Sequence, residues 1–166
     1  MENSLSAQSR VWIFQADRTL SDYESSTITD KVNAFVQQWT AHKLGVKGAG
    51  YLLYNRFIIL MADEEEVAVS GCSIESSVHF IHTIAREFEL EFFDRWNFAY
   101  QNGNAVESCG REKFQQLVEQ GIINNQTIVF NNLVKTKAEF ESKWRIEYKD
   151  SWHKNLNAAP LPFDSL

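Results

Sequence analysis

Phe57-Ile58-Ile59-Leu60-Met61 is an unbroken apolar run, and it sets the architecture expected for the N-terminal half of the chain. An earlier run, Arg10-Val11-Trp12-Ile13-Phe14-Gln15, is also apolar at successive positions. Because neighbouring side chains of a strand point to opposite faces, such runs indicate strands that are covered on both faces. We therefore expect these two segments to be the inner strands of one sheet.

Two helices are predicted beside these strands. Ser21 and Glu24 have the spacing of a capping box, and the apolar residues that follow predict a helix over residues 21–42. A second apolar stripe predicts a helix over residues 73–89. Further strands are predicted over residues 47–54, before the reversal at Asn55-Arg56, and over residues 91–100, before the hairpin signal Asn102-Gly103.

The order strand-helix-strand-strand-helix-strand predicts an α+β protein with a ferredoxin-like βαββαβ sheet. Its two helices would cover one face of the sheet. The other face is apolar as well, so we expect it to be covered either by the remaining residues or by a second copy of the chain. If the remaining residues do not cover this face, we expect a protein partner or a homodimer.

The predicted domain organisation is a single α+β domain over residues 10–157, between a flexible N-terminus over residues 1–9 and a flexible tail over residues 158–166. The domain would consist of a ferredoxin-like half, residues 10–100, and a C-terminal α/β extension, residues 101–157. Within the extension, the pattern predicts alternating strands and helices over residues 105–108, 111–120, 127–130 and 136–144.

Composition excludes several classes of function. The chain of 166 residues is 44% hydrophobic and carries a net charge of −6, which argues against nucleic acid or an anionic membrane as a partner. No stretch approaches the ~18 apolar residues of a membrane span, and the first nine residues lack the order of a signal peptide. We expect a cytoplasmic protein in which Cys72 and Cys109 are reduced.

Cys72 is the candidate catalytic residue. It stands at the predicted start of the second helix, where the helix dipole favours the thiolate. A reactive thiol also needs a base, and His42 or His153 could supply one through the fold. The alternative is a small buried side chain between loop and helix. A thiol-dependent enzyme or redox sensor is thus one hypothesis for the function.

Glu75, His79 and His82 are weak candidates for a metal site. Their spacing places them on one face of the second helix, and three such residues can hold a metal ion when a fourth ligand comes from elsewhere. Arg86 continues the same face, however, and its charge would oppose a cation. Because this face lies opposite the apolar stripe, we expect a solvated polar surface and no bound metal.

No cofactor is predicted. The segment Gly45-Val46-Lys47-Gly48-Ala49-Gly50 lacks the Lys-Ser/Thr ending of a phosphate-binding P-loop and leads into a predicted strand. Near the C-terminus, Asp150-Ser151-Trp152-His153 could cap a short helix through Asp150 or Ser151, or present Trp152 to a ligand. Because no reaction constellation is assembled, the leading hypothesis is a non-catalytic binding or regulatory protein whose ligand is unknown.

The chain resembles a family of small uncharacterised bacterial proteins often labelled "ABC transporter ATPase". The resemblance covers residues 10–153 and lies in stretches such as Val11-Trp12-Ile13-Phe14-Gln15, Gln38-Trp39-Thr40-Ala41-His42, Gly71-Cys72-Ser73-Ile74 and Ser151-Trp152-His153. The chain lacks the motifs of a P-loop ATPase, and the family implies no activity. Residues 101–130 are also similar to GYF-like adaptor domains, which bind proline-rich peptides, but without the aromatic signature of their peptide groove.

Overall fold

The computed structural model describes residues 5–41, 47–63 and 71–156, which form helices and antiparallel strands. The α+β class is therefore confirmed. The chain forms two compact units: unit 1 comprises Met1–Asp94 and Val134–Glu141, and unit 2 comprises Arg95–Leu133 and Ser142–Leu166. This division differs from the predicted halves, because residues 95–100 belong to unit 2 and residues 134–141 return to unit 1.

Unit 1 contains a three-stranded antiparallel sheet. Its strands β1 (Arg10–Gln15), β2 (Lys47–Leu53) and β3 (Phe57–Asp63) lie in the order β1-β3-β2. All seven residues of β3 are buried, so the apolar run correctly predicts an inner strand covered on both faces. Ile59 is paired with Ile13 of β1 on one side and with Tyr51 of β2 on the other.

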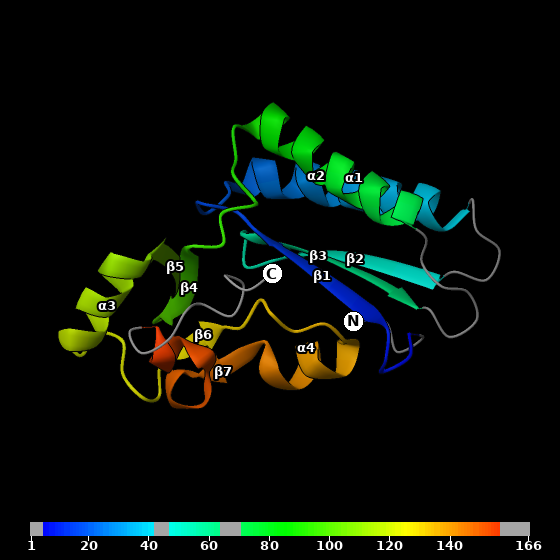
Figure 1. Ribbon diagram of the computed structural model, residues 1–166. Helices are drawn as coiled ribbons and strands as arrows, with labels where there is room; N and C mark the ends of the chain where they lie inside the picture. Colours follow the sequence, from blue (N-terminus) through cyan, green and yellow to red (C-terminus); the bar gives the residue numbers. More distant parts are fainter. Residues whose placement is uncertain (1–4, 42–46, 64–70, 157–166) are drawn as a thin grey trace. The chain divides into compact units, whose positions relative to one another are not determined.

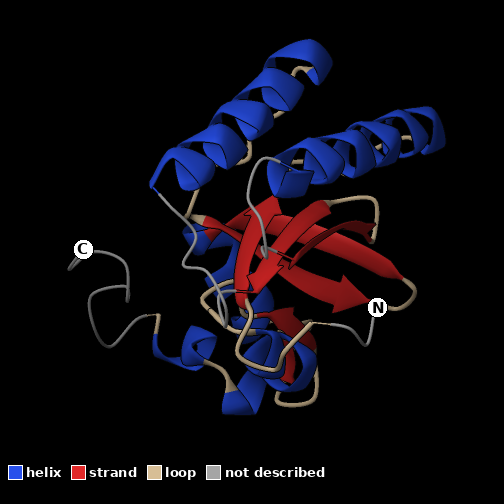
Figure 2. Ribbon diagram, turned by 90° about the vertical axis from the view of Figure 1, so that its right-hand side faces the viewer, coloured by secondary structure: helices blue, strands red, loops and turns tan. Residues whose placement is uncertain are grey.

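Helices α1 (Asp22–Ala41) and α2 (Gly71–Phe88) cover one face of this sheet (Figures 1 and 2). The predicted capping box is confirmed, because the Ser21 amide donates to the Glu24 carboxylate at 2.8 Å and the Glu24 amide donates to the Ser21 hydroxyl at 3.2 Å. Ile28 and Ile81 on the buried sides of the two helices belong to one apolar core with Leu60 of β3.

The strand predicted over residues 91–100 forms only from Asn97 onward and does not join the unit 1 sheet, so the ferredoxin-like four-stranded sheet is not formed. Residues 90–94 are irregular, because side-chain carboxylates accept hydrogen bonds from the backbone there. The Glu91 amide donates to the Asp17 carboxylate at 3.0 Å, and the Phe93 amide donates to the Glu91 carboxylate at 2.6 Å. The strand that follows, β4 (Asn97–Asn102), pairs within unit 2. The outer edge of β1 instead receives a returning segment, since the Val11 amide donates to the Lys135 carbonyl at 2.9 Å.

The second face of the unit 1 sheet is buried as well. Val11, Ile59 and Met61 on this face are at most 6% exposed. Figure 1 shows α4 (Lys137–Lys143) on the side of the sheet opposite α1 and α2, and the Lys137 ammonium donates to the Leu5 carbonyl at 3.0 Å. The chain's own residues therefore provide the predicted cover, which removes the argument for a homodimer through this face.

The predicted flexible N-terminus over residues 1–9 needs a correction for the part that the structure describes. Leu5 is 5% exposed and Ser9 is fully buried. The Ser9 carbonyl accepts from the Lys137 amide at 2.8 Å, and the Ala7 carbonyl accepts from the Ala138 amide at 2.9 Å. Residues 5–9 are thus held by the start of α4. Residues 1–4 and the predicted tail over residues 158–166 lie outside the described residues.

Unit 2 is built on a second antiparallel sheet with the order β5-β4-β6-β7. Its other elements are β5 (Ala105–Gly110), α3 (Arg111–Glu119), β6 (Ile128–Phe130), β7 (Arg145–Glu147) and two short 3-10 helices, η1 (Tyr148–Asp150) and η2 (Trp152–Asn155). The predicted hairpin after Asn102 is confirmed, with Gly103 at φ +60°. No helix in the part of the chain that the structure describes is long and apolar enough to cross a bilayer.

Gly50 provides a test of the packing between α1 and β2. A Cβ atom at this position would lie 2.6 Å from Val32 Cγ1 and 2.8 Å from Val36 Cγ2. Because valine side chains in a helix have one strongly preferred rotamer, neither can turn away. We expect Gly50→Ala to lower the free energy of unfolding by about 1–3 kcal/mol, measured by urea titration.

The control for this substitution is Asn33→Ala at an exposed position of α1. It should change the free energy of unfolding by no more than about 0.5 kcal/mol, because only helix propensity is altered. Equal stability of Gly50→Ala and the parent protein would contradict the close approach of β2 to α1.

Candidate functional site

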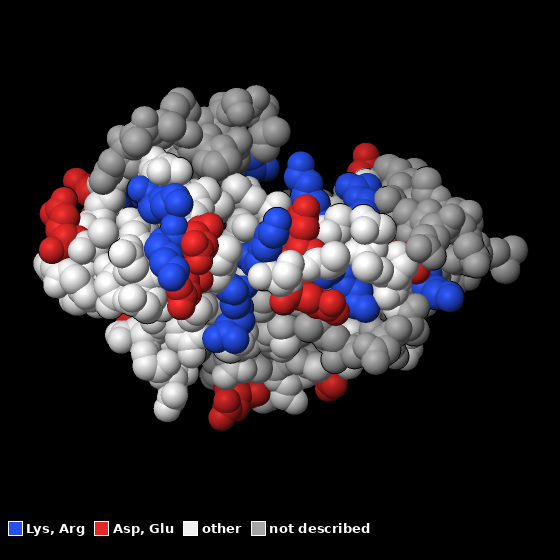
Figure 3. Space-filling model, turned by 90° about the horizontal axis from the view of Figure 1, so that it is seen from below, with Lys and Arg blue, Asp and Glu red and all other residues white. Residues whose placement is uncertain are grey.

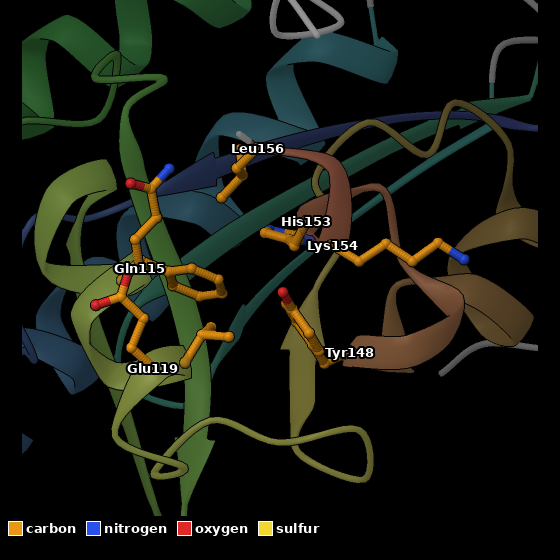
Figure 4. A pocket seen from close by; sticks show the side chains of 8 residues that line it. Gln115, Glu119, Tyr148, His153, Lys154 and Leu156 are labelled. Atoms are coloured by element: carbon orange, nitrogen blue, oxygen red, sulfur yellow. The ribbon is translucent and has the colours of Figure 1, made fainter. Parts of the chain in front are cut away.

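A small hollow in unit 2 is the candidate site (Figure 4). Its volume is about 50 Å³, and roughly 10–15 Å³ on the same measure is enough to hold one water molecule. Residues from α3 and from the segment after β7 line it in equal number: Phe114, Gln115, Val118, Glu119, Tyr148, His153, Lys154 and Leu156. The helical spacing of the first four places them on one side of α3.

His153 is the most deeply buried polar group of the hollow, with 1% of its surface exposed. Aromatic rings enclose it: Trp152 stacks on its ring at 3.9 Å, while Phe98 and Phe114 lie 5.7 and 5.6 Å away between ring centroids. This burial lowers the pKa of His153 to about 3. The imidazole is therefore neutral at physiological pH, because charging it here would cost its hydration.

Ser151 determines which nitrogen of His153 carries the proton. The Ser151 hydroxyl lies 2.6 Å from His153 Nδ1. It also accepts from the His153 amide, so Ser151 caps the short helix η2, as predicted. Among the described residues the hydroxyl has no other acceptor than Nδ1, so we assign it as the donor in that bond. The ring proton is then on Nε2. This assignment makes Nε2–H a hydrogen-bond donor.

His153 Nε2 is buried and has no hydrogen-bond partner among the described residues. Leaving a buried donor unpaired costs about 1–3 kcal/mol, which is a large part of the stability of a small protein. In Figure 4 the His153 side chain lies across from Gln115 of α3 and near the hydroxyl end of Tyr148. The Nε2 atom is itself covered by the surrounding side chains, so within the described structure its missing partner is a cost to stability.

Tyr148 brings a second donor to the same place. Figure 4 shows its hydroxyl end turned toward His153. Burial raises the pKa of Tyr148, so the phenol keeps its proton at neutral pH. No hydrogen-bond partner of this hydroxyl lies within the described part of the chain. The hollow is thus lined by an uncharged phenol and an uncharged imidazole.

The charged residues of the hollow point away from these donors. In Figure 4 the Glu119 carboxylate and the Lys154 side chain extend in opposite directions from His153. Lys154 Nζ donates to the Lys149 carbonyl at 2.9 Å, which holds it away from the inner end. The carboxylate and the ammonium therefore do not face His153 or the Tyr148 hydroxyl, which are both uncharged.

The grouping predicted around Cys72 falls largely outside the described residues. Cys72 lies in the first turn of α2, as predicted, and nothing further is described of its side chain. His42 lies outside the described residues, and His153 belongs to unit 2 with its Nδ1 bonded to Ser151. The catalytic role of Cys72 with His42 or His153 stays a prediction.

The weak metal candidates lie on the exposed side of α2. Glu75, His79 and His82 are all exposed, and the His82 ring stacks on Phe93 at 4.3 Å. Within residues 5–41, 47–63 and 71–156, no three side chains of His, Cys, Asp or Glu are placed to hold a metal ion. Trp152, expected as a ligand contact or packing residue, donates from its indole to Asn131 at 2.9 Å and packs on His153.

Comparison of the chain with protein-family models, with curated proteins and with solved structures gives no match. The resemblance to the small bacterial family therefore stays a prediction, as does the similarity to GYF-like adaptors. Sequence reasoning pointed to His153 but missed Tyr148 and Glu119. For Glu119 the signal was the apolar stripe of α3, which does not show what packs against this helix.

The burial of His153 predicts acid sensitivity. Its folded pKa of about 3 lies below the ordinary 6.5, so below pH 6.5 the unfolded chain binds a proton that the folded protein does not. This stability contribution is complete above pH 6.5 and is lost progressively as the pH falls toward 3. Between pH 6.5 and 5 we expect a loss of roughly 2 kcal/mol in the free energy of unfolding of unit 2.

Urea titration followed through the amide NMR signals of unit 2 measures this loss. His153→Gln should remove most of the pH dependence, whereas His79→Gln, at an exposed position of α2, should retain it. The ring signals of His153 in the folded parent give an independent check. A titration midpoint near 6.5 would disprove the neutral buried imidazole.

Proposed function

We propose that the protein is a non-catalytic binding or regulatory protein and that the hollow in unit 2 is its ligand site. The observation that carries this proposal is the hollow itself, where the Tyr148 hydroxyl lies among apolar side chains of α3. Binding sites combine apolar walls with a few polar groups, and Phe114 and Val118 with the phenol of Tyr148 fit that description.

The close pair Ser151 and His153 invites comparison with a serine nucleophile and its base, and three features speak against that function. The Ser151 side chain is 3% exposed and does not line the hollow, so a substrate carbonyl cannot approach its oxygen. The Ser151 hydroxyl also accepts from the His153 amide as the cap of η2, which fixes its position within the helix start. A histidine with a pKa of about 3 is also far from the pKa near 7 that suits a general base.

The charge distribution supports a ligand other than nucleic acid or a membrane surface. On the face that Figure 3 presents, basic and acidic side chains lie interspersed rather than gathered by sign. Ion pairs within the described part of the chain include Lys149 with Glu147 at 3.1 Å and Lys137 with Glu141 at 3.7 Å. A polyanion needs a positive surface, which this face does not offer. A cytoplasmic location is part of the proposal and is supported by the free thiol of Cys109.

A panel of small probes tests the proposed site. Titration of the ¹⁵N-labelled protein with N-methylacetamide, acetate, phosphate and methylammonium should shift the amide signals around Tyr148 and His153 with at least one probe. Tyr148→Phe should weaken that binding by about threefold to tenfold, because one hydrogen bond is lost while the ring remains.

Tyr23→Phe is the matched control, since Tyr23 is 77% exposed on α1 in unit 1. It should leave the affinity unchanged. If no probe of the four shifts signals at the hollow, the proposed function fails.

The thiol hypothesis is the second candidate function, and the start of α2 at Gly71 supports it, because Cys72 then lies in the first helical turn. It predicts that Cys72 reacts with iodoacetamide at pH 7 faster than Cys109, whose pKa is raised by burial. Peptide mass spectrometry after timed labelling measures both rates in one sample. A rate at Cys72 no higher than at Cys109 would end this hypothesis.

A further inference from the structure

We propose that the protein forms a two-fold symmetric homodimer in which the outer edge of β2 pairs with the same strand of a second copy. This inference goes beyond the proposed ligand site, because it assigns an interaction surface in unit 1 and names its partner. In the dimer the three-stranded sheets of the two copies join into one continuous antiparallel sheet.

The first step concerns the edges of the unit 1 sheet. Its order is β1-β3-β2, and no described strand other than β3 pairs with β2. The edge of β1 differs, because Arg10 forms a bridge with Thr136 and the Val11 amide donates to the Lys135 carbonyl. Along an edge strand, alternate residues direct their amide and carbonyl groups outward, which makes the edge a template for a further strand.

The second step concerns the features that usually prevent such pairing. Exposed edges are protected by proline, by bulges or by charges within the strand. β2 pairs with β3 in an unbroken register over seven residues, contains no proline, and carries its single charge on Lys47 at its first position. The edge strand β5 of unit 2 instead has Glu107 in its interior. β2 is therefore the edge that is suited to pairing.

The third step concerns the partner, because the sequence of β2 is complementary to itself about Gly50. In antiparallel two-fold pairing centred there, Gly48 lies opposite Leu52 of the partner subunit, and Ala49 lies opposite Tyr51 of the partner subunit. A small residue thus meets a large one at each of these positions. Tyr51 and Leu52 are only half-buried in the single chain, so the pairing covers more of their apolar surface.

The side of α1 beside this edge supports the same partner. α1 packs over β2, since a Cβ atom at Gly50 would lie 2.6 Å from Val32 Cγ1. On its other side, Lys31 lies 3.2 Å from Glu87 of α2. After Asp22 in the first turn, the helical period places only uncharged residues on the side away from α2: Ser26, Thr29, Asn33, Val36 and Thr40. In a chain with 23% charged residues, this uncharged strip fits burial against the same strip of a second copy.

Light scattering after size-exclusion chromatography tests the dimer with the full chain, at concentrations from about 1 to 300 µM. We expect the mass to rise with concentration from 19.2 kDa toward twice that value. Asn33→Lys should weaken the dimer at least about tenfold, because two-fold symmetry places two ammonium groups in one interface. Gln38→Lys is the matched control, since Gln38 is exposed and lies about 140° further around α1, and it should leave the affinity unchanged.

Hydrogen exchange locates the interface without a substitution. Raising the concentration should slow the exchange of the outward amides of β2 and leave those of β5 unchanged. A monomer at every concentration would overturn the inference, as would a dimer whose β2 amides gain no protection. Equal effects of Asn33→Lys and Gln38→Lys on the dimer would also contradict it.

Discussion

The complete burial of β3 is the constraint on which unit 1 depends. Both edges of this strand are bonded, to β1 and to β2, and both of its faces are apolar. A strand of this kind requires cover above and below, since exposing either face would forfeit about 25 cal/mol for each Å² of apolar surface left in water. Helices α1 and α2 supply one cover, and the segment over residues 134–141 returns to supply the other.

This return explains how the chain is divided. Unit 2 begins at Arg95, is interrupted by Val134–Glu141 and resumes at Ser142, so the polypeptide crosses between the units three times. The returning segment also serves β1, whose Val11 amide is bonded to Lys135. A ferredoxin-like sheet would have provided a fourth strand at this edge, and here the edge is closed by a short bridge between Arg10 and Thr136.

The sequence predicts those features that depend on neighbours in the chain. The capping box at Ser21 and Glu24, the hairpin at Gly103 and the inner position of β3 each follow from residues only a few positions apart. The error over residues 91–100 has a long-range cause, because the Glu91 amide is bonded to Asp17, which lies 74 positions earlier. The hollow is likewise assembled from two segments about thirty residues apart, and the neutral state of His153 depends on rings from both β4 and η2.

The arrangement around His153 lowers the stability of unit 2. An apolar side chain in its place would avoid a buried nitrogen that has no partner among the described residues, so the protein carries a cost of the kind that functional sites impose. Burial among Phe98, Phe114 and Trp152 adds to this cost below pH 6.5, because the folded protein keeps the imidazole neutral while the unfolded chain binds a proton. The Ser151 hydroxyl, 2.6 Å from Nδ1, offsets only part of the cost, because it pairs one of the two ring nitrogens.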